Sequence, residues 1–352
     1  MRDHVIAAAP APVSEAELDH ALSVPSAALV RCLADLDGPI IVLGAGGKMG
    51  PSLARMARRG LDAADGARRR HVYAVSRWSD QRSAERLARD GVDIIVADLR
   101  DRHAVAALPT APNVIFMVGQ KFGTGGDPAE TWGMNTIVPA WCGEHFAGAR
   151  QVVFSTGNVY PLTATSGAGA TESTPLAPVG DYAMSCLGRE RVMTALGAWK
   201  KSPLALYRLN YACALTYGVL TDLAVKVRDG IPIDVTMGAV NVIWQRDAND
   251  IALRLLTHAA MPPIAVNVTG SETLQVRELA AALGQRLGRQ PVVIGSEAPD
   301  ALLSDARALH LRFPDLQPMP LEQLLDWTAE WVGADRPLLG KATRFEVRDG
   351  HF

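Results

Sequence analysis

The stretch from Pro39 to Gly50, which reads PIIVLGAGGKMG, limits the possible folds of this chain more than any other. Residues 40–43 form a short apolar run of the kind that makes a buried parallel strand. The run leads into a glycine-rich segment, and residues 52–57 then carry apolar side chains at helical spacing. A strand, a glycine turn and a helix in this order are typical of a turn that binds the pyrophosphate of a dinucleotide at a helix N-terminus.

The glycines of this turn have separate expected roles. Gly44 permits the tight turn, Gly47 lets the backbone approach the pyrophosphate, and Gly50 lets the helix pack on the strand. The residues expected to contact a dinucleotide here are Gly44, Gly46, Gly47, Lys48, Met49 and Gly50. The alternative is a glycine-rich turn in an α/β protein that binds nothing, and on this turn alone it stays open.

The composition is that of a globular protein, because 48% of the 352 residues are hydrophobic and 20% are charged. The net charge of −2 argues against nucleic acid or an anionic membrane as a partner. No apolar run approaches the ~20 residues that cross a bilayer. The cysteines have no C-x-x-C spacing, which favours reduced thiols in a cytoplasmic protein over a disulfide framework or a zinc site. They are Cys32, Cys142, Cys186 and Cys213.

From residue 39 onward, apolar runs alternate with helical segments. This rhythm predicts an α/β fold with a doubly wound parallel sheet of the Rossmann type. After the first strand, further strands are expected at 72–75, 92–97, 113–118, 151–155 and 203–209. Past residue 215 the rhythm becomes irregular, which predicts a smaller, mixed C-terminal lobe that binds the substrate. Ligands are then expected at the carboxyl ends of the strands.

Three parts of the chain are therefore expected. Residues 1–37 form an N-terminal helical extension, in which Ser14 and Ser26 are candidate helix caps. Residues 38–215 form the dinucleotide-binding domain, and residues 216–352 form the substrate lobe and tail, with segments such as 240–260 returning to the first domain. The tail over 340–352 alternates apolar and charged residues, which predicts an edge strand or a flap over the substrate lobe.

The end of the second strand bears on the choice of cofactor. An NAD-binding Rossmann domain usually has a carboxylate there that holds the ribose 2′-hydroxyl. This chain has Ser76 and Arg77 instead, and a guanidinium can bind a 2′-phosphate, so NADP is favoured over NAD. Asp98 and Leu99, after the third strand, are candidates for holding the adenine. An ordinary helix cap is the equal alternative for Asp98.

Several segments, in order, resemble the extended short-chain dehydrogenase/reductase superfamily and, within it, the NAD(P)-dependent epimerase/dehydratase family. The segment 153–160, VFSTGNVY, resembles the SSxxVYG signature, and 172–190 resembles the segment that carries the family's tyrosine. Further weak matches are Asn135, 208–211, 244–248 and 267–279. The resemblance covers roughly residues 39–290, and weak motifs in register are far more specific than the glycine turn alone.

The catalytic residues of that family carry over to this chain with one departure. In the family a Ser or Thr orients the substrate hydroxyl, a Tyr exchanges its proton, and a Lys four residues later lowers the pKa of the Tyr. The resemblance implies Thr156 and Tyr182 for the first two roles, but the lysine position is Cys186. An unperturbed Tyr has a pKa of about 10, so it needs a nearby positive charge to act as a base at neutral pH.

Three explanations for Cys186 stay open. The positive charge comes from another residue, for which Lys121 is the candidate, because it follows the fourth strand beside Val118 and Gly119 in a segment that borders the nicotinamide in this fold. Alternatively, Tyr182 acts only as a neutral hydrogen-bond donor while another residue takes the proton. In the third explanation, the protein binds a dinucleotide but has lost redox chemistry. The simplest alternative for Lys121 itself is a solvated loop lysine.

The resemblance implies an enzyme that uses NAD(P) to oxidise a carbinol carbon transiently, with net epimerisation, dehydration or reduction of a sugar-like substrate. Asn158, Asn210, Tyr211 and Arg246 are candidates for contacts with such a polyhydroxylated molecule. Helices after the fourth and fifth strands pair across a dimer in many relatives, which predicts a homodimer. The rival function is a dinucleotide-binding sensor or scaffold with little or no turnover.

Overall fold

The computed structural model describes residues 10–65, 70–121 and 127–351. Residues 1–9 of the expected N-terminal extension and the last residue of the expected tail lie outside these ranges. The two candidate caps are confirmed: the Ser14 side chain caps α1 (Glu15–Ala21) and the Ser26 side chain caps α2 (Ala27–Ala34). Each hydroxyl accepts a hydrogen bond from the backbone N–H three residues on, which satisfies one donor of the first helical turn.

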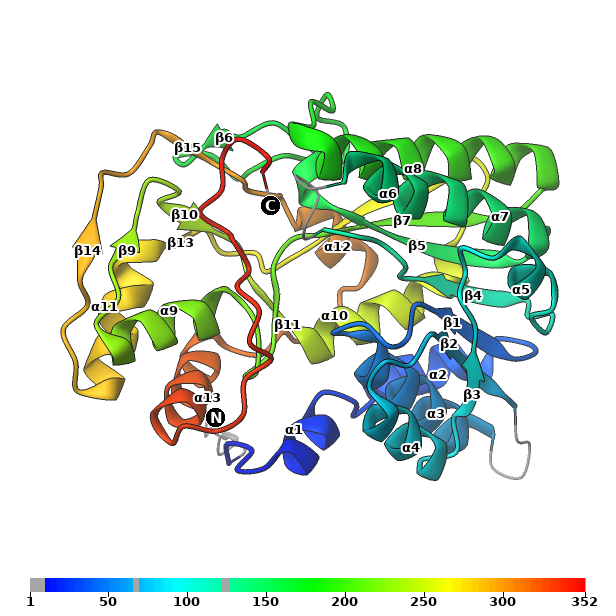
Figure 1. The fold of residues 1–352 in the computed structure, drawn as a ribbon, viewed down its shortest axis with the longest axis horizontal. Coiled ribbons are helices and arrows are strands. Elements are labelled where there is room, and N and C mark those ends of the chain that lie inside the picture. The colour runs from blue at the N-terminus through cyan, green and yellow to red at the C-terminus, as the bar shows by residue number, and fades with distance from the viewer. Residues whose placement is uncertain (1–9, 66–69, 122–126, 352) are drawn as a thin grey trace, which may run out of the picture.

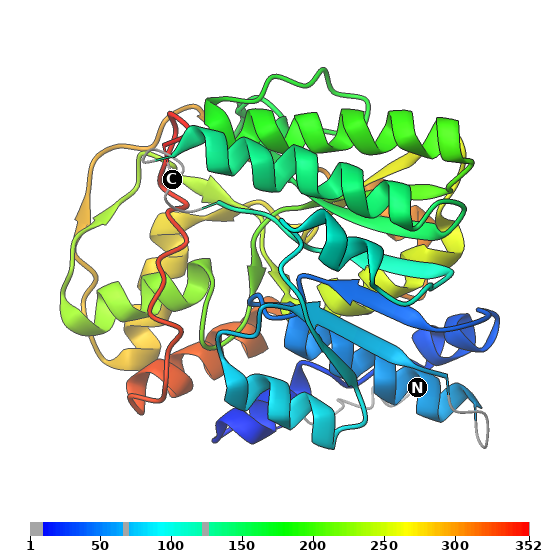
Figure 2. The same cartoon turned by 45° about the vertical axis from the view of Figure 1, so that its right-hand side comes forward.

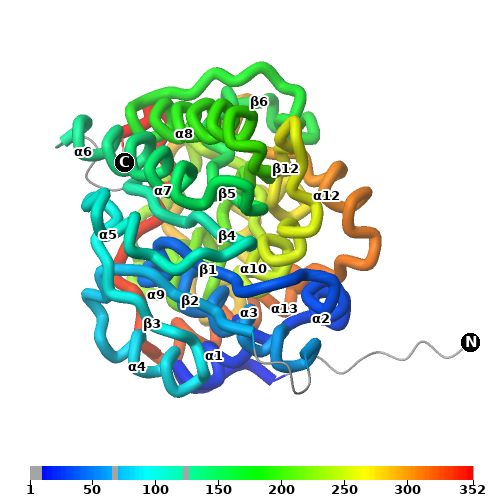
Figure 3. The backbone as a smooth tube through the Cα atoms, turned by 90° about the vertical axis from the view of Figure 1, so that its right-hand side faces the viewer, coloured from blue at the N-terminus to red at the C-terminus, as the bar shows by residue number. Residues whose placement is uncertain are grey.

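A parallel sheet of seven strands forms the centre of the protein, in the order β12-β7-β5-β4-β1-β2-β3. Figure 3 shows β3, β2, β1, β4 and β5 following one another in this order. The strands are β1 (Ile40–Leu43), β2 (Val72–Ser76), β3 (Asp93–Val96), β4 (Asn113–Phe116), β5 (Arg150–Thr156), β7 (Leu204–Leu209) and β12 (Ile264–Val268). The expected doubly wound Rossmann sheet is confirmed. The seventh strand, β12, lies within the part of the chain expected to form the second lobe, and it pairs in parallel with β7.

Helices cover both faces of the sheet because alternate strand residues point to opposite sides. Ile40 and Val42 pack in one apolar core, whereas Ile41 and Leu43 pack in the other. The first face carries α2, α3 (Gly50–Asp65), α4 (Gln81–Arg89), α10 (Gln245–Arg254) and α12 (Arg307–Arg312). The second face carries α5 (Arg102–Ala106), α6 (Pro128–Trp132), α7 (Val138–His145) and α8 (Gly180–Lys200). α10 thus packs on the main sheet although it comes late in the chain.

A second group of elements packs around an apolar core of its own. Its helices are α9 (Val219–Asp229), α11 (Val276–Leu287) and α13 (Leu321–Gly333). The short strand pairs outside the main sheet are β8 (Ala212–Cys213) with β11 (Ile243–Trp244), β9 (Ile233–Asp234) with β14 (Val293–Ile294), β10 (Ala239–Val240) with β13 (Leu274–Gln275), and β6 (Thr163–Ala164) with β15 (Asp300–Ala301). Figure 1 shows α9, α11 and α13 on one side of the sheet, with α10 between the two groups.

The C-terminal segment, drawn in red in Figures 1 and 2, leaves α13 and runs along the boundary between the two groups. It reaches the beginning of α8, where Gly350 lies against Gly180. Residues 334–351 contain no strand, so the expected edge strand is wrong and the alternative, an irregular segment lying over other elements, is what the structure has. We call residues 337–350 the C-terminal strap.

Candidate active site

The glycine turn follows β1 as expected and leads into α3. Gly44 has a φ of +87°, and the N–H groups of Gly44 and Ala45 both donate to the Val75 carbonyl, at 2.9 and 3.0 Å. A Cβ at Gly50 would overlap the Ala45 carbonyl, so glycine is needed there for helix and turn to pack closely. At Gly47, apart from its two chain neighbours, the only atom of the described residues within 4 Å of a built Cβ is the Gly44 carbonyl oxygen, at 3.4 Å. Space beside Gly47 is what a bound pyrophosphate needs.

A cavity of about 160 Å³ lies at the carboxyl ends of β5 and β7 and brings together residues from distant parts of the sequence. All three expected catalytic residues, Thr156, Tyr182 and Lys121, line it. Of the other expected site residues, Lys48, Met49, Asn158, Asn210 and Tyr211 line it too. Tyr217, Gln245 and Thr343 also line it, and none of them is among the expected site residues. We call this the inner cavity.

A second cavity, of about 380 Å³, adjoins the inner one at the glycine turn. Gly46, Gly47 and Trp78 form part of its wall, and Lys48, Tyr217 and Gln245 line both cavities. Its outer wall comes from α1 and from residues 337–341 of the strap. In the sequence, these two segments precede and follow the part that resembles the family. The two cavities form one cleft from the end of β2 to Tyr182, and this is where an open α/β sheet binds its ligands.

Thr156 and Tyr182 form the hydroxyl pair of the inner cavity. Thr156 ends β5, and its Oγ1 donates to Asn158 Oδ1 at 2.9 Å. Tyr182 lies in the first turn of α8, and burial raises the pKa of its phenol, whereas the hydrogen bond with Thr156 opposes that rise. Cys186, one turn further on, is 1% exposed and its own pKa is also raised by burial. A neutral thiol at that position offers no positive charge to the phenol.

Lys121 and Lys48 bring positive charge to the cleft. Lys121 Nζ lies 5.8 Å from the centroid of the Tyr182 ring, and burial lowers its pKa to about 8. Lys48 Nζ lies 3.4 Å above the Tyr217 ring, and its pKa falls to about 7, first through burial and then through repulsion from Lys121 and Lys341. Because the pKa values of both amines are lowered, an anionic ligand in the cleft would stabilise their protonated forms, and the cleft therefore favours an anion.

Asn135 fixes the segment that carries Lys121. Its Oδ1 accepts from the Gln120 N–H at 3.0 Å, and its Nδ2 donates to the Gln120 carbonyl at 3.1 Å and to Ser185 Oγ at 2.8 Å. Arg189 of α8 donates to the same Oδ1 at 2.6 Å. Asn135 therefore ties the residues after β4 to the helix of Tyr182, which places Lys121 beside the phenol.

A buried polar network beneath the cavity joins the other weak motifs. Arg208 donates to Glu190 through Nε and Nη2, at 2.9 and 2.7 Å, and to the Tyr160 hydroxyl at 2.7 Å. Ser155 donates to Glu190 at 2.6 Å, and Tyr160 donates to Asn267 Oδ1 at 2.8 Å. Motifs more than 100 residues apart thus converge on one network. It connects β5, β7, β12 and α8 directly under Thr156.

Arg77, Asp98, Leu99 and Arg246 are expected site residues that do not line either cavity. Arg77 is exposed and Leu99 is part of the sheet core, and neither lines the cleft. Asp98 accepts from Arg100 at 2.6 Å, which lowers the pKa of its carboxyl to about 2 and occupies the group expected to hold the adenine. Arg246 donates to the Val24 carbonyl at 3.0 Å and lines a different, open groove, so the structure does not bring it to the substrate candidates.

Val118 and Gly119 lie where the glycine turn and α8 approach β4. Val118 is buried against the turn, because a Cβ at Gly44 would come within 2.9 Å of its nitrogen. A Cβ at Gly119 would meet the Arg189 guanidinium at 2.7 Å. Ser76 Oγ occupies the space that a Cβ at Gly46 would need. These three residues therefore shape the backbone around the cleft.

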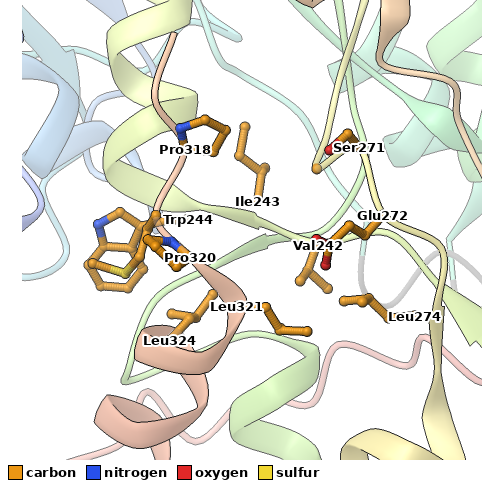
Figure 4. Close-up of a pocket in the computed structure, with 12 residues that line it drawn as sticks. Val242, Ile243, Trp244, Ser271, Glu272, Leu274, Pro318, Pro320, Leu321 and Leu324 are labelled. Carbon is orange, nitrogen blue, oxygen red and sulfur yellow. The ribbon is translucent and has the colours of Figure 1, made fainter. Parts of the chain in front are cut away.

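A separate cavity of about 160 Å³ lies between β11, the 270–274 segment and the start of α13. Figure 4 shows Ser271 and Glu272 on one side of it and Trp244, Pro318 and Pro320 on the other. Its lining is mainly apolar and contains none of the expected site residues. In the part of the chain that the structure describes, no three His, Cys, Asp or Glu residues gather as a metal site, and no helix is long and apolar enough to cross a membrane.

A comparison with protein-family models matches residues 40–218 to the model described as "NAD dependent epimerase/dehydratase family". The chain belongs to this family. A comparison with curated proteins finds no match. The matched segment contains the glycine turn, Lys121, Thr156 and Tyr182, and it excludes both α1 and the strap.

Solved structures of similar fold cover most of the chain at low sequence identity. The dTDP-glucose 4,6-dehydratase DesIV of Streptomyces venezuelae, solved with NAD, has a TM-score of 0.69 at 18% identity and covers 84% of this chain and 97% of its own. The UDP-glucose 4-epimerase of Thermus thermophilus, also with NAD, has a TM-score of 0.66 at 19% identity and covers 83% and 98%. A putative epimerase from Burkholderia cenocepacia has a TM-score of 0.68 at 19% identity and covers 85% and 99%. At these identities the likeness establishes the fold.

Proposed function

We propose that the protein is a nicotinamide-dinucleotide-dependent epimerase, dehydratase or reductase that acts at a carbinol carbon of a sugar-like substrate. The observation that carries this proposal is the inner cavity. Thr156, Tyr182 and Lys121 line it together, and it continues to the glycine turn through Lys48. The names of the similar structures, which include a sugar-nucleotide epimerase and a dehydratase, support the same class of substrate.

Each residue of the cleft has a part in this function. Gly44, Gly47 and the N-terminus of α3 would hold the dinucleotide pyrophosphate, with Lys48 beside it. The bound dinucleotide supplies a hydride acceptor and donor. Thr156 orients the substrate hydroxyl, and Tyr182 takes and returns its proton. Tyr182 must be a phenolate to take this proton. Because burial raises its pKa, the phenolate needs positive charge nearby, which Lys121, with its Nζ 5.8 Å from the ring centroid, would supply together with Arg189.

The enzyme is tested by separating cofactor binding from turnover. Wild type, Tyr182→Phe and Lys121→Met would be titrated with NAD and NADP by calorimetry and assayed on a panel of sugar nucleotides. The proposal predicts that Tyr182→Phe still binds the dinucleotide but loses at least about 100-fold in turnover. Cys186 at the lysine position favours a second candidate, a dinucleotide sensor. Tight binding without turnover of any substrate by wild type would support the sensor, and absence of binding would contradict both functions.

We propose NADP as the preferred dinucleotide, although the family is described as NAD-dependent and the similar structures contain NAD. The support is the end of β2, where Ser76 stands in place of a carboxylate and the exposed Arg77 follows. Arg77→Ala should weaken NADP binding about fivefold, as expected for an exposed ion pair of ~1 kcal/mol, and leave NAD binding unchanged. Arg289→Ala, at an exposed position on the second lobe, is the control for a general loss of positive charge. Equal binding of NAD and NADP by wild type would contradict the preference.

We further propose a homodimer that acts in the cytoplasm. Three large apolar side chains on the outer side of the α7–α8 region, Ile137, Met184 and Trp199, are 50%, 46% and 75% exposed, which supports pairing through these helices. The four cysteines are all free thiols, which suits a reducing compartment. Sedimentation of wild type and Trp199→Glu tests the dimer. The variant should be monomeric, and a wild-type monomer at micromolar concentration would contradict it.

A further inference from the structure

The C-terminal strap is held along its whole length, and it passes over the cleft. Near its start, the Leu339 N–H donates to the Thr216 carbonyl at 3.0 Å. In the middle, Phe345 is fully buried in the core of the second group of elements. Farther on, Lys226 pairs with Glu346 and Arg348 pairs with Asp300. A segment without secondary structure that makes this many contacts is a fixed part of the fold and forms a wall of both cavities.

Thr343 is the strap residue that reaches the inner cavity. It is 3% exposed and lines this cavity together with Tyr182 and Lys121. Its N–H and its hydroxyl both donate to Asp222 Oδ2 of α9, at 2.7 and 2.6 Å. Two hydrogen bonds from one residue to one carboxylate oxygen fix the position of Thr343. The carbonyl of Thr343, on the peptide that follows, accepts a hydrogen bond from Lys121 Nζ at 3.3 Å.

We propose that Thr343 is a positioning residue of the active site, which, braced by Asp222, holds the Lys121 ammonium beside Tyr182. The inference rests on the proposed function, because it assigns to the strap the placement of the charge that stands in for the lysine absent at position 186. A carbonyl acceptor and a carboxylate behind it favour the charged form of an amine. The charge of Lys121 therefore depends on a segment that lies outside the family match.

The charged and titratable groups around the Lys121 ammonium determine the direction in which its pKa should change when one of them is replaced. Cys186 and Asp222 favour its protonated form, Arg344 and Lys48 oppose it, and Tyr182 lies against it. Removing the Asp222 charge should therefore lower the pKa of Lys121. Removing the Thr343 hydroxyl should lower it too, because the carbonyl of Thr343 is then held less firmly in position. This shift does not require a known substrate, so it is measured independently of turnover.

The experiment follows the modification of Lys121 by an amine-reactive reagent between pH 6 and pH 11, with peptide mass spectrometry of the full-length protein. Asp222→Asn and Thr343→Val should each lower the midpoint by roughly half to one pH unit relative to wild type. Thr343→Ser keeps the hydroxyl and should retain the wild-type midpoint. Thr257→Val is the matched control, because Thr257 is an exposed threonine whose hydroxyl bonds a backbone carbonyl outside the cleft.

The outcomes separate this inference from the proposed function. A wild-type midpoint in either Asp222→Asn or Thr343→Val, with the fold retained by circular dichroism, would overturn the role of Thr343. So would a shift of equal size in Thr257→Val. Dinucleotide titration of the same variants reports on the proposed function instead: wild type that binds no dinucleotide contradicts that function, while the Lys121 midpoints still decide the placement of the ammonium.

Discussion

Replacing Lys121 with Met tests whether its ammonium is held in the cleft at a cost to stability. Lowering the pKa from the usual 10.5 to about 8 corresponds to about 3.4 kcal/mol of free energy against the protonated form in the folded protein. The side chain keeps some contact with solvent, and Met leaves the Thr343 carbonyl without its donor, so only part of this energy is recoverable. We expect Lys121→Met to raise the free energy of unfolding by roughly 1–2 kcal/mol at pH 6.

The dependence on pH is the decisive part of this prediction. Because the folded-state pKa lies below the unfolded one, the unfolded protein binds more protons between about pH 8 and pH 10.5, and wild-type stability rises with pH there. The advantage of Lys121→Met should therefore shrink through this window and vanish near its top. Urea unfolding at intervals of one pH unit, with Lys200→Met as an exposed control, measures it. A destabilised variant at pH 6, or an advantage that does not change with pH, would refute the reasoning.

Three further changes follow from the same geometry. Glu190→Gln should lower the free energy of unfolding by about 3 kcal/mol, because it leaves the buried Arg208 guanidinium without its counter-charge. A loss below about 1 kcal/mol in urea unfolding would contradict the importance of this buried network for stability. Gly50→Ala should cost about 1–3 kcal/mol and weaken dinucleotide binding, because its Cβ meets the Ala45 carbonyl; unchanged affinity would contradict the packing of the turn. Cys186→Lys should lower the melting temperature and give no turnover beyond that of wild type, whereas a gain would indicate that Lys121 does not supply the charge.

The sequence predicts the sheet well because its signals are local. The run at 40–43 and the following turn specify β1 and the start of α3, and alternate burial on two faces repeats for the other predicted strands. The weak motifs also predict which residues meet, since Glu190, Arg208 and Asn267 belong to one network. β12 is different. It is a short strand far along the chain, and only its pairing with β7 assigns it to the sheet.

The site is less predictable where it depends on contacts between distant segments. Tyr217, Gln245 and Thr343 line the inner cavity. No motif surrounds Tyr217 or Thr343, and the motif at 244–248 does not single out Gln245; Thr343 is brought to the cavity by a strap of irregular backbone. Trp78, with a φ of +51°, lines the second cavity, beside the glycine turn, in a backbone conformation that no pattern for a bulky residue predicts. Arg246 matches a motif but its guanidinium is taken by the Val24 carbonyl. Sequence spacing does not show which acceptor a side chain finds.

The proposed function requires a dinucleotide to lie in the cleft between the glycine turn and Tyr182, and protection of the lysines from modification tests this most directly. The protein would be labelled with an amine-reactive reagent with and without NADP or NAD, and modification of each lysine would be followed by mass spectrometry. At ten times the dissociation constant, the dinucleotide should slow modification of Lys48 and Lys121 by about tenfold and leave the exposed Lys200 and Lys201 unchanged. If each of the four lysines reacted at the same rate with millimolar dinucleotide as without it, the proposed function would be contradicted.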